Sequence, residues 1–212
     1  MIQNRRFVGC TTFLLGLVLG HVGALGQETK ELKPYTYCHF SDGLQVVKVD
    51  PLTAGITERA IETADGTRHI EMNAGLRIMF AYPTSDFYAN VKVESLPPNH
   101  YDEEKKWLID NYDYILQTSK DSKSNATLQS PMSGFDVRGN DRTKLEGGVL
   151  GLYLAFDDQA RVVTTVYLLN QEPYERSFQT IEQYQAMRDV FLKHYFSCVR
   201  LNQKLLAQAE KK

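Results

Sequence analysis

Two long apolar runs in the C-terminal half constrain the fold of this chain most. Val149–Phe156 and Arg161–Leu169 are rich in valine, leucine and tyrosine, and only Asp157-Asp158-Gln159-Ala160 separates them. Runs of β-branched and aromatic residues are typical of strands, and so short a polar connection joins antiparallel neighbours. The sequence therefore predicts a tight β-hairpin here.

Other short apolar or alternating runs also predict strands. Asp65-Gly66 separates two of them, and Asp-Gly favours a hairpin because both residues tolerate positive φ. Prolines or polar clusters end the others. The predicted strands are Leu44–Val49, Ile56–Thr63, Thr67–Met72, Leu76–Tyr82, Ala89–Leu96 and Gly134–Arg138.

Two segments have the periodicity of helices. The first follows the acids Asp102, Glu103 and Glu104, which favour a helix start, and its stripe is Leu108, Tyr112, Ile115 and Leu116. The second has a longer stripe at spacings of three and four: Ile181, Tyr184, Met187, Phe191, Tyr195 and Cys198. Leu201, Leu205 and Leu206 extend this pattern, and we expect the Lys/Gln/Glu-rich end to fray.

The order of strands, helix, strands and helix indicates an α+β domain. Hairpin connections favour a largely antiparallel sheet with helices packed on it. We expect a flexible N-terminal segment over residues 27–37, a single domain over residues 38–200, and a C-terminal tail over residues 201–212.

The first 26 residues have the features of a signal peptide. Two arginines precede an apolar stretch over residues 7–25, and small residues at positions 24 and 26 fit cleavage before Gln27. A retained transmembrane anchor is the alternative, although the strongly apolar part, residues 13–19, is short for ~30 Å of hydrocarbon. We expect a secreted or periplasmic protein without stable membrane insertion after cleavage.

The charge balance disfavours binding to nucleic acid. Loss of Arg5 and Arg6 with the signal leaves 22 basic and 26 acidic residues, a formal charge of −4. Neutralising phosphates requires a clustered positive surface, and the sequence has no basic block. The remaining 186 residues suit one domain with its own core.

Two cysteines, Cys38 and Cys198, remain after signal cleavage. An even number in an exported protein favours a disulfide, worth about 4–5 kcal/mol for so long a loop in the chain-entropy model. Two separate buried thiols are the alternative. The neighbouring His39 and His194 would matter for thiol catalysis only if the cysteines were reduced, because the nucleophile must be a free thiolate.

In the pattern and order of their predicted strands and helices, residues 70–198 resemble the Mog1/PsbP-like domains, an α/β/α sandwich. The resembling stretches are Leu76–Pro83, Ala89–Glu94, the helix from Trp107 to Leu116, the hairpin Val149–Leu169 and the closing Phe191–Ser197. The resemblance implies a non-catalytic accessory, assembly or binding role. The cysteine pair and the Gln-rich tail depart from the family pattern.

Four residues are candidates for a site. His69 and Glu71 share a face of a predicted strand and would begin a metal site or an acid/base pair. His100 and Asp102 cluster before the first helix, where a cation would fit. A solvated strand face and helix-start chemistry explain the same residues, and a structural metal site needs about four ligands. We therefore expect no catalytic residues, cofactor or metal.

Glycines and one asparagine complete the motifs. Gly151, Gly139 and Gly134 occur in or before strands, where glycine permits a bend or bulge, and no helix follows to make a phosphate loop. Asn125 begins a glycosylation acceptor sequence in a predicted loop.

Three functions stay open. The first is an exported, non-catalytic domain that binds a protein partner in the cell envelope or secreted space, or assists its assembly. The second is a small-molecule or metal-binding domain, including a hydrolase, with a pocket lined by Tyr82, Phe87, Tyr88, Tyr112 and Tyr153. The third is a structural envelope protein anchored in the membrane through an uncleaved signal.

Overall fold

The computed structural model describes most of the chain after residue 31. The described residues are 32–36, 38, 40, 43–52, 55–60, 67–81, 87–118, 127–142, 145, 148–170 and 176–211, with only the backbone given for 56–60, 67–69, 112–118 and 127. The expected signal peptide, the Asp65-Gly66 turn and Asn125 lie outside them.

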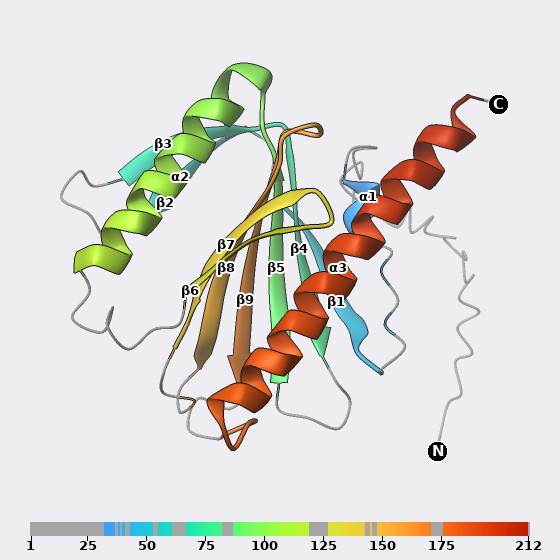
Figure 1. The fold of residues 1–212 in the computed structure, drawn as a ribbon. Helices are drawn as coiled ribbons and strands as arrows, with labels where there is room; N and C mark the ends of the chain where they lie inside the picture. Colours follow the sequence, from blue (N-terminus) through green and yellow to red (C-terminus); the bar gives the residue numbers. More distant parts are fainter. Residues whose placement is uncertain are drawn as a thin grey trace, which may run out of the picture.

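Seven strands form one antiparallel sheet, as the α+β prediction requires (Figure 1). Hairpins between sequential strands join β4 to β5 and connect β6, β7, β8 and β9, whereas β1 pairs with β4 across the intervening β2 and β3. β5 and β9 pair at the centre. In spatial order the strands are β1 (Gln45–Leu52), β4 (Ala74–Ala81), β5 (Phe87–Ser95), β9 (Val162–Asn170), β8 (Val149–Asp157), β7 (Phe135–Asp141) and β6 (Thr127–Met132). The predicted hairpin between residues 149 and 169 is confirmed as β8–β9.

A separate two-stranded sheet pairs β2 (Gly55–Ala60) with β3 (Thr67–Met72). The pairing is antiparallel, with Ala60 opposite Thr67, so the two predicted strands do pair with each other. A two-residue turn at Asp65-Gly66 would instead place residue 64 opposite Thr67, so the register differs from the one that the sequence predicted. The predicted first strand extended to Thr63, and residues 61–63 lie outside the described part of the chain.

The edge strand β6 was not predicted from the sequence. It contains Pro131, which an edge strand tolerates because one side of its backbone is not paired. A two-residue turn, Ser133-Gly134, joins it to β7, with positive φ at both positions (50° and 82°). This is the geometry of a tight hairpin turn. Gly134 therefore lies in the turn, and the predicted strand over Gly134–Arg138 is corrected to Phe135–Asp141.

Both predicted helices are present. α3 (Ile181–Ala209) buries Tyr184, Phe191 and Tyr195 of its predicted stripe. α2 (Pro98–Thr118) buries Leu108, and the other three side chains of its stripe lie outside the described residues. A capping box starts α3: the Thr180 hydroxyl accepts a hydrogen bond from the backbone N–H of Gln183 at 3.3 Å, and the Gln183 side chain accepts one from the Thr180 backbone. α3 continues to Ala209, as the extension of its stripe through Leu201, Leu205 and Leu206 indicated. Residues 201–209 of the expected tail are therefore helical, because leucine, lysine, glutamine and alanine favour helix.

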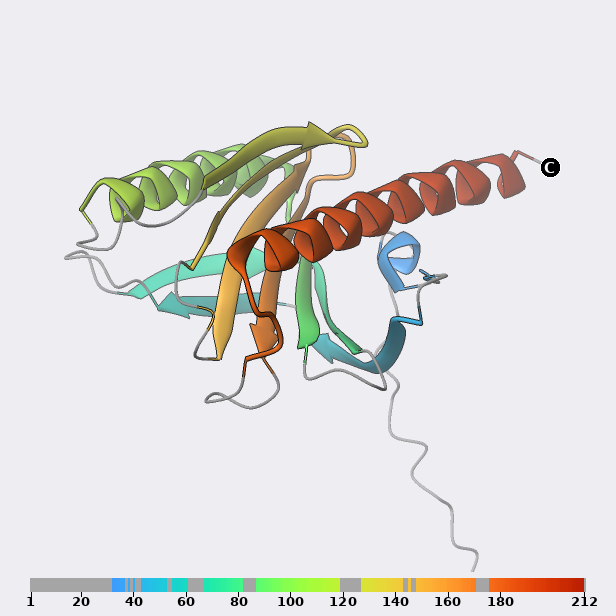
Figure 2. The same cartoon turned by 60° about the horizontal axis from the view of Figure 1, so that its bottom comes forward.

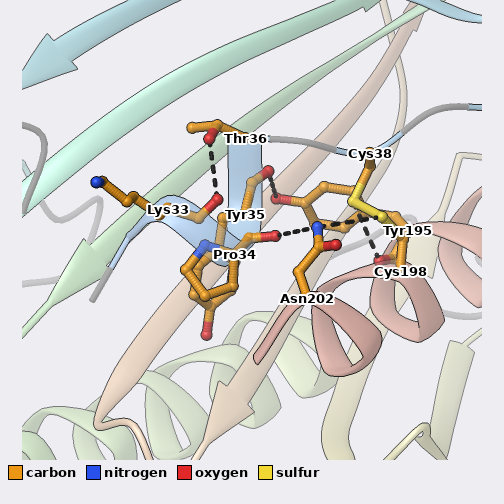
Figure 3. Close-up of a disulfide and its surroundings, with 8 residues drawn as sticks. All are labelled: Lys33, Pro34, Tyr35, Thr36, Cys38, Tyr195, Cys198 and Asn202. Atoms are coloured by element: carbon orange, nitrogen blue, oxygen red, sulfur yellow. Dashed lines mark hydrogen bonds between the residues drawn. A yellow bond between two sulfur atoms is a disulfide. The ribbon is translucent and has the colours of Figure 1, made fainter. Parts of the chain in front are cut away.

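The disulfide between Cys38 and Cys198 is present, with the Cα atoms 5.7 Å apart (Figure 3). It ties the segment around α1 (Lys33–Thr36) to the middle of α3. The expectation of a flexible segment through residue 37 is wrong for residues 32–36, because Tyr35 is fully buried against α3 and Asn202 donates a 3.0 Å hydrogen bond to the Pro34 carbonyl.

The sheet has a core cluster on each face. Tyr153 and Ala155 of β8 belong to a cluster with α3, while Leu154 and Phe156 belong to a second cluster with α2 and β3. Alternate residues of a strand point to opposite faces, so α3 and α2 cover opposite faces of the sheet. Figure 1 shows α3 crossing in front of the strands and α2 beside their upper end, near β2 and β3.

Candidate functional site

A patch of apolar and aromatic side chains lies on the sheet face opposite α3. Tyr88 of β5 pairs with Leu169 of β9, which pairs with Val149 of β8. One row along, Tyr167 of β9 pairs with Leu152 of β8. Directly paired residues share a face, and the neighbours of Tyr88 and Tyr167 along their strands belong to the α3 cluster, which places all five on the other face. We call these five residues the sheet-face patch.

The α2 cluster ends before the sheet-face patch begins. The side chains of Leu154 and Val163 are buried by that cluster, whereas Tyr167 is 37% exposed and Val149 is 38% exposed. Tyr88, Leu152 and Leu169 are half-buried. Within the described part of the chain, α2 and the β2–β3 hairpin thus cover one end of this face and leave the other end open.

Polar side chains border the sheet-face patch on the same face. Asn90 and Asn140 lie in the row of Tyr167, and Lys92 and Arg77 lie in the row toward α2. Lys92 forms a 2.8 Å ion pair with Glu94. An exposed apolar patch with a polar rim is typical of protein–protein interaction sites, where tyrosine is enriched.

The four candidate site residues from the sequence come together only in part. His100, at the start of α2, lies 3.7 Å from Glu71 on β3, measured from Nδ1 to Oε2, and both side chains are partly exposed. Asp102 is exposed on α2, and the His69 side chain lies outside the described residues. No group of three or more metal-ligating side chains occurs among the described residues, which leaves a single exposed contact.

Most of the described aromatic residues that were proposed to line a pocket are buried in the core. Phe87 and Tyr153 are buried in the α3 cluster. Tyr82 and the Tyr112 side chain lie outside the described residues. Tyr88 alone of the described three is half-exposed, and it belongs to the sheet-face patch.

A buried ionic network joins β7, β8 and α3. The carboxylate of Asp141 accepts hydrogen bonds from the Tyr153 hydroxyl and from the Arg188 guanidinium, and the Tyr153 and Tyr184 hydroxyls share another. Burial, with the charge of Asp141 nearby, raises the pKa of both tyrosines well above the usual tyrosine value. Because Asp141 and both tyrosines are fully buried, we assign the network to holding α3 on the sheet.

The cysteines do not form a thiol site. Both sulfur atoms are in the disulfide, so neither can be a thiolate nucleophile. His39 lies outside the described residues. His194 lies beside Phe40, with the ring centroids 6.2 Å apart.

The sequence contained a partial signal for the sheet-face patch. In β5 the polar Asn90 and Lys92 alternate with buried valines, which indicates one solvated face, and Tyr88 shares it. In β9 the run is apolar throughout, so no alternation marks Tyr167 as exposed. How much of this sheet face α2 covers depends on tertiary packing, which the sequence pattern does not predict.

The structure bears on where the protein is located, but comparison with known proteins does not assign it to a family. The disulfide is compatible with an extracellular protein, and within the described ranges no helix is long and apolar enough to cross a membrane. The Mog1/PsbP-like resemblance stays a hypothesis based on the order of elements. No family model matches the chain, and no match is found among curated proteins or solved structures.

Proposed function

We propose that this chain is an exported, non-catalytic domain that binds a protein partner, as an accessory or assembly factor. The single observation that carries the proposal is the sheet-face patch, in which Tyr167 and Val149 are more than a third exposed beside Tyr88, Leu152 and Leu169. Such side chains gain free energy when a partner removes them from water, at about 25 cal/mol per Å² of apolar surface.

The form of the patch favours a protein over a small molecule. It extends across three adjacent strands, β5, β9 and β8, so its side chains stand on an open pleated surface. Small ligands bind mostly in concave sites that enclose them, whereas a broad face with a polar rim suits another protein.

Two features support an extracellular or periplasmic location. Residues 1–26 have the pattern of a cleavable signal, and a disulfide persists in oxidising compartments. We accordingly place the partner in the cell envelope or the secreted space.

We further propose that the fold is an α/β/α sandwich of the Mog1/PsbP-like kind. The placement of α2 and α3 against opposite faces of an antiparallel sheet supports this assignment. Such domains usually serve as accessory or binding modules, which agrees with the function proposed from the patch.

Native mass spectrometry of the protein gently purified from its own host tests the proposal. We expect a co-purifying protein, with chemical cross-links to β5 and β9. Turnover of a substrate, or co-purifying proteins of which none cross-links to the sheet-face patch, would refute this function. The same spectrum reports loss of residues 1–26 and of two cysteine hydrogens.

A further inference from the structure

The C-terminal third of α3 forms a groove on the opposite side of the molecule from the sheet-face patch. Figure 2 shows this end of the helix extending beyond the strands, next to α1. Two hollows of about 780 and 440 Å³ lie along it. Both are lined by Gln159, Arg200, Gln203 and Ala207, so they adjoin. We call the two together the α3 groove.

Arg200 fixes one wall of the α3 groove. Its Nε donates to the Ser133 carbonyl at 2.9 Å and one Nη to the Gly134 carbonyl at 2.8 Å, while the other Nη bonds Asp157 at 2.9 Å. The guanidinium also lies 4.1 Å from the ring centroid of Phe135. A surface held this firmly loses little entropy on binding, which increases affinity.

Two cations of the groove have no ion-pair partner in the part of the chain that the structure describes. Among those residues the larger hollow is lined by Arg200 and Lys204 and by no acid, and Arg161 lines the smaller one. Arg200 is neutralised by Asp157, but no ion pair of Lys204 or Arg161 occurs among the described residues. The other lining acid, Glu210, lies near the end of the helix and has an interaction of its own.

The α3 groove also has apolar side chains beside its cations. Leu201 lines the larger hollow and is 56% exposed, and Ala207 lies between the two hollows. The groove therefore offers two unpaired cations and apolar contacts within one concave surface, which complements a chain that carries carboxylates and an apolar side chain.

We propose that the α3 groove binds an acidic segment of a partner protein. Its carboxylates face Lys204 and Arg161, and an apolar side chain packs against Leu201 and Ala207. An extended chain can enter a hollow between the helix and the β8–β9 turn, whereas the flat surface of an anionic membrane cannot, which favours a protein segment over lipid.

The probe for this proposal is a short fluorescein-labelled peptide of alternating glutamate and leucine pairs. Fluorescence anisotropy measures its binding to the oxidised mature protein, with a peptide that carries lysine in place of glutamate as the reference. We expect the acidic peptide to bind and the basic one not to bind. Added salt should weaken binding because the cations are near the surface.

Three variants locate the binding. Lys204→Glu with Arg161→Glu should weaken it by about tenfold or more. Lys193→Glu with Arg142→Glu makes the same charge change at exposed residues outside the groove and should leave most of the affinity. Ala207→Trp fills the groove without altering charge and should also abolish binding. Circular dichroism checks that each variant is folded.

Three results would overturn the proposal. Equal weakening by both charge-reversed pairs, or full binding by Ala207→Trp, would show general electrostatic attraction without a groove site. No difference between the two peptides would exclude an acidic ligand. Binding to phosphatidylserine vesicles that is lost in the Lys204→Glu, Arg161→Glu variant, without peptide binding, would assign the cations to lipid.

Discussion

Asp157, at the end of β8, accepts a 2.9 Å hydrogen bond from Arg200 of α3 while its carboxylate is fully buried. The same carboxylate receives the Tyr35 hydroxyl at 3.2 Å and the Gln203 amide at 2.8 Å. One side chain thus joins the sheet, α1 and the end of α3, and it lies beneath the α3 groove.

Asp157→Ala should lower the free energy of unfolding by about 2–4 kcal/mol, because these three side-chain donors and the backbone N–H of Ala160 lose their buried acceptor. Urea denaturation measures the change. Asp158→Ala is the control, since that neighbouring side chain is 66% exposed and its loss should cost about 1 kcal/mol or less. Equal effects of the two variants would contradict the role assigned to Asp157.

Removal of the disulfide should destabilise the protein strongly. The bridge closes a loop with a sequence separation of 160, so Cys38→Ser with Cys198→Ser should cost about 5 kcal/mol in the chain-entropy model. Unfolding curves of this variant and of the oxidised protein provide the comparison. A difference below about 1 kcal/mol would show that packing alone holds α1 on α3.

Gly151→Ala should destabilise the protein by about 1–3 kcal/mol through overpacking. A methyl group at this position would overlap the hydroxyl oxygens of both Tyr153 and Tyr184. Gly148→Ala is the matched control, because its added methyl group meets nothing within 4 Å and should change stability by less than about 0.5 kcal/mol. Thermal unfolding measures both variants. A larger loss of stability in Gly148→Ala than in Gly151→Ala would contradict the close packing of Tyr153 and Tyr184 against Gly151.

Stability should fall above about pH 10, where tyrosine ionises in an unfolded chain. Burial raises the folded-state pKa of five tyrosines, so the folded state keeps protons that the unfolded state releases. Their contribution to stability is complete below pH 10 and is lost above it. The five are Tyr35, Tyr101, Tyr153, Tyr184 and Tyr195. Their absorbance at 295 nm should change together with the loss of circular dichroism. Ionisation of these tyrosines near pH 10 while the protein stays folded would contradict their raised pKa.

Much of the fold follows from local patterns. The apolar runs predict β8 and β9, and the spacing of Tyr184, Phe191 and Tyr195 predicts α3, because each pattern records which face is buried. Pro131 obscured β6, since proline in a run normally argues against a strand. Polar neighbours obscured α1, whose burial depends on Tyr35 reaching Asp157.

The candidate site was less predictable, for a physical reason. The exposure of Tyr167 depends on where α2 ends over the sheet, and the α3 groove depends on how far the helix extends past the strands. Both are tertiary relationships between segments distant in sequence. Glu71 and His100 do approach each other, but only because β3 ends beside the start of α2.

The most direct test of the central claim compares two double variants by native mass spectrometry after purification from the host. Val149→Lys with Tyr167→Lys alters the sheet-face patch, and Val46→Lys with Val49→Lys alters apolar residues of similar exposure on edge strand β1. We expect the first pair to lose the co-purifying protein, with affinity reduced by about tenfold or more, and the second pair to retain it. Retention of the partner by the first pair, or its loss from both pairs, would contradict binding through the sheet face.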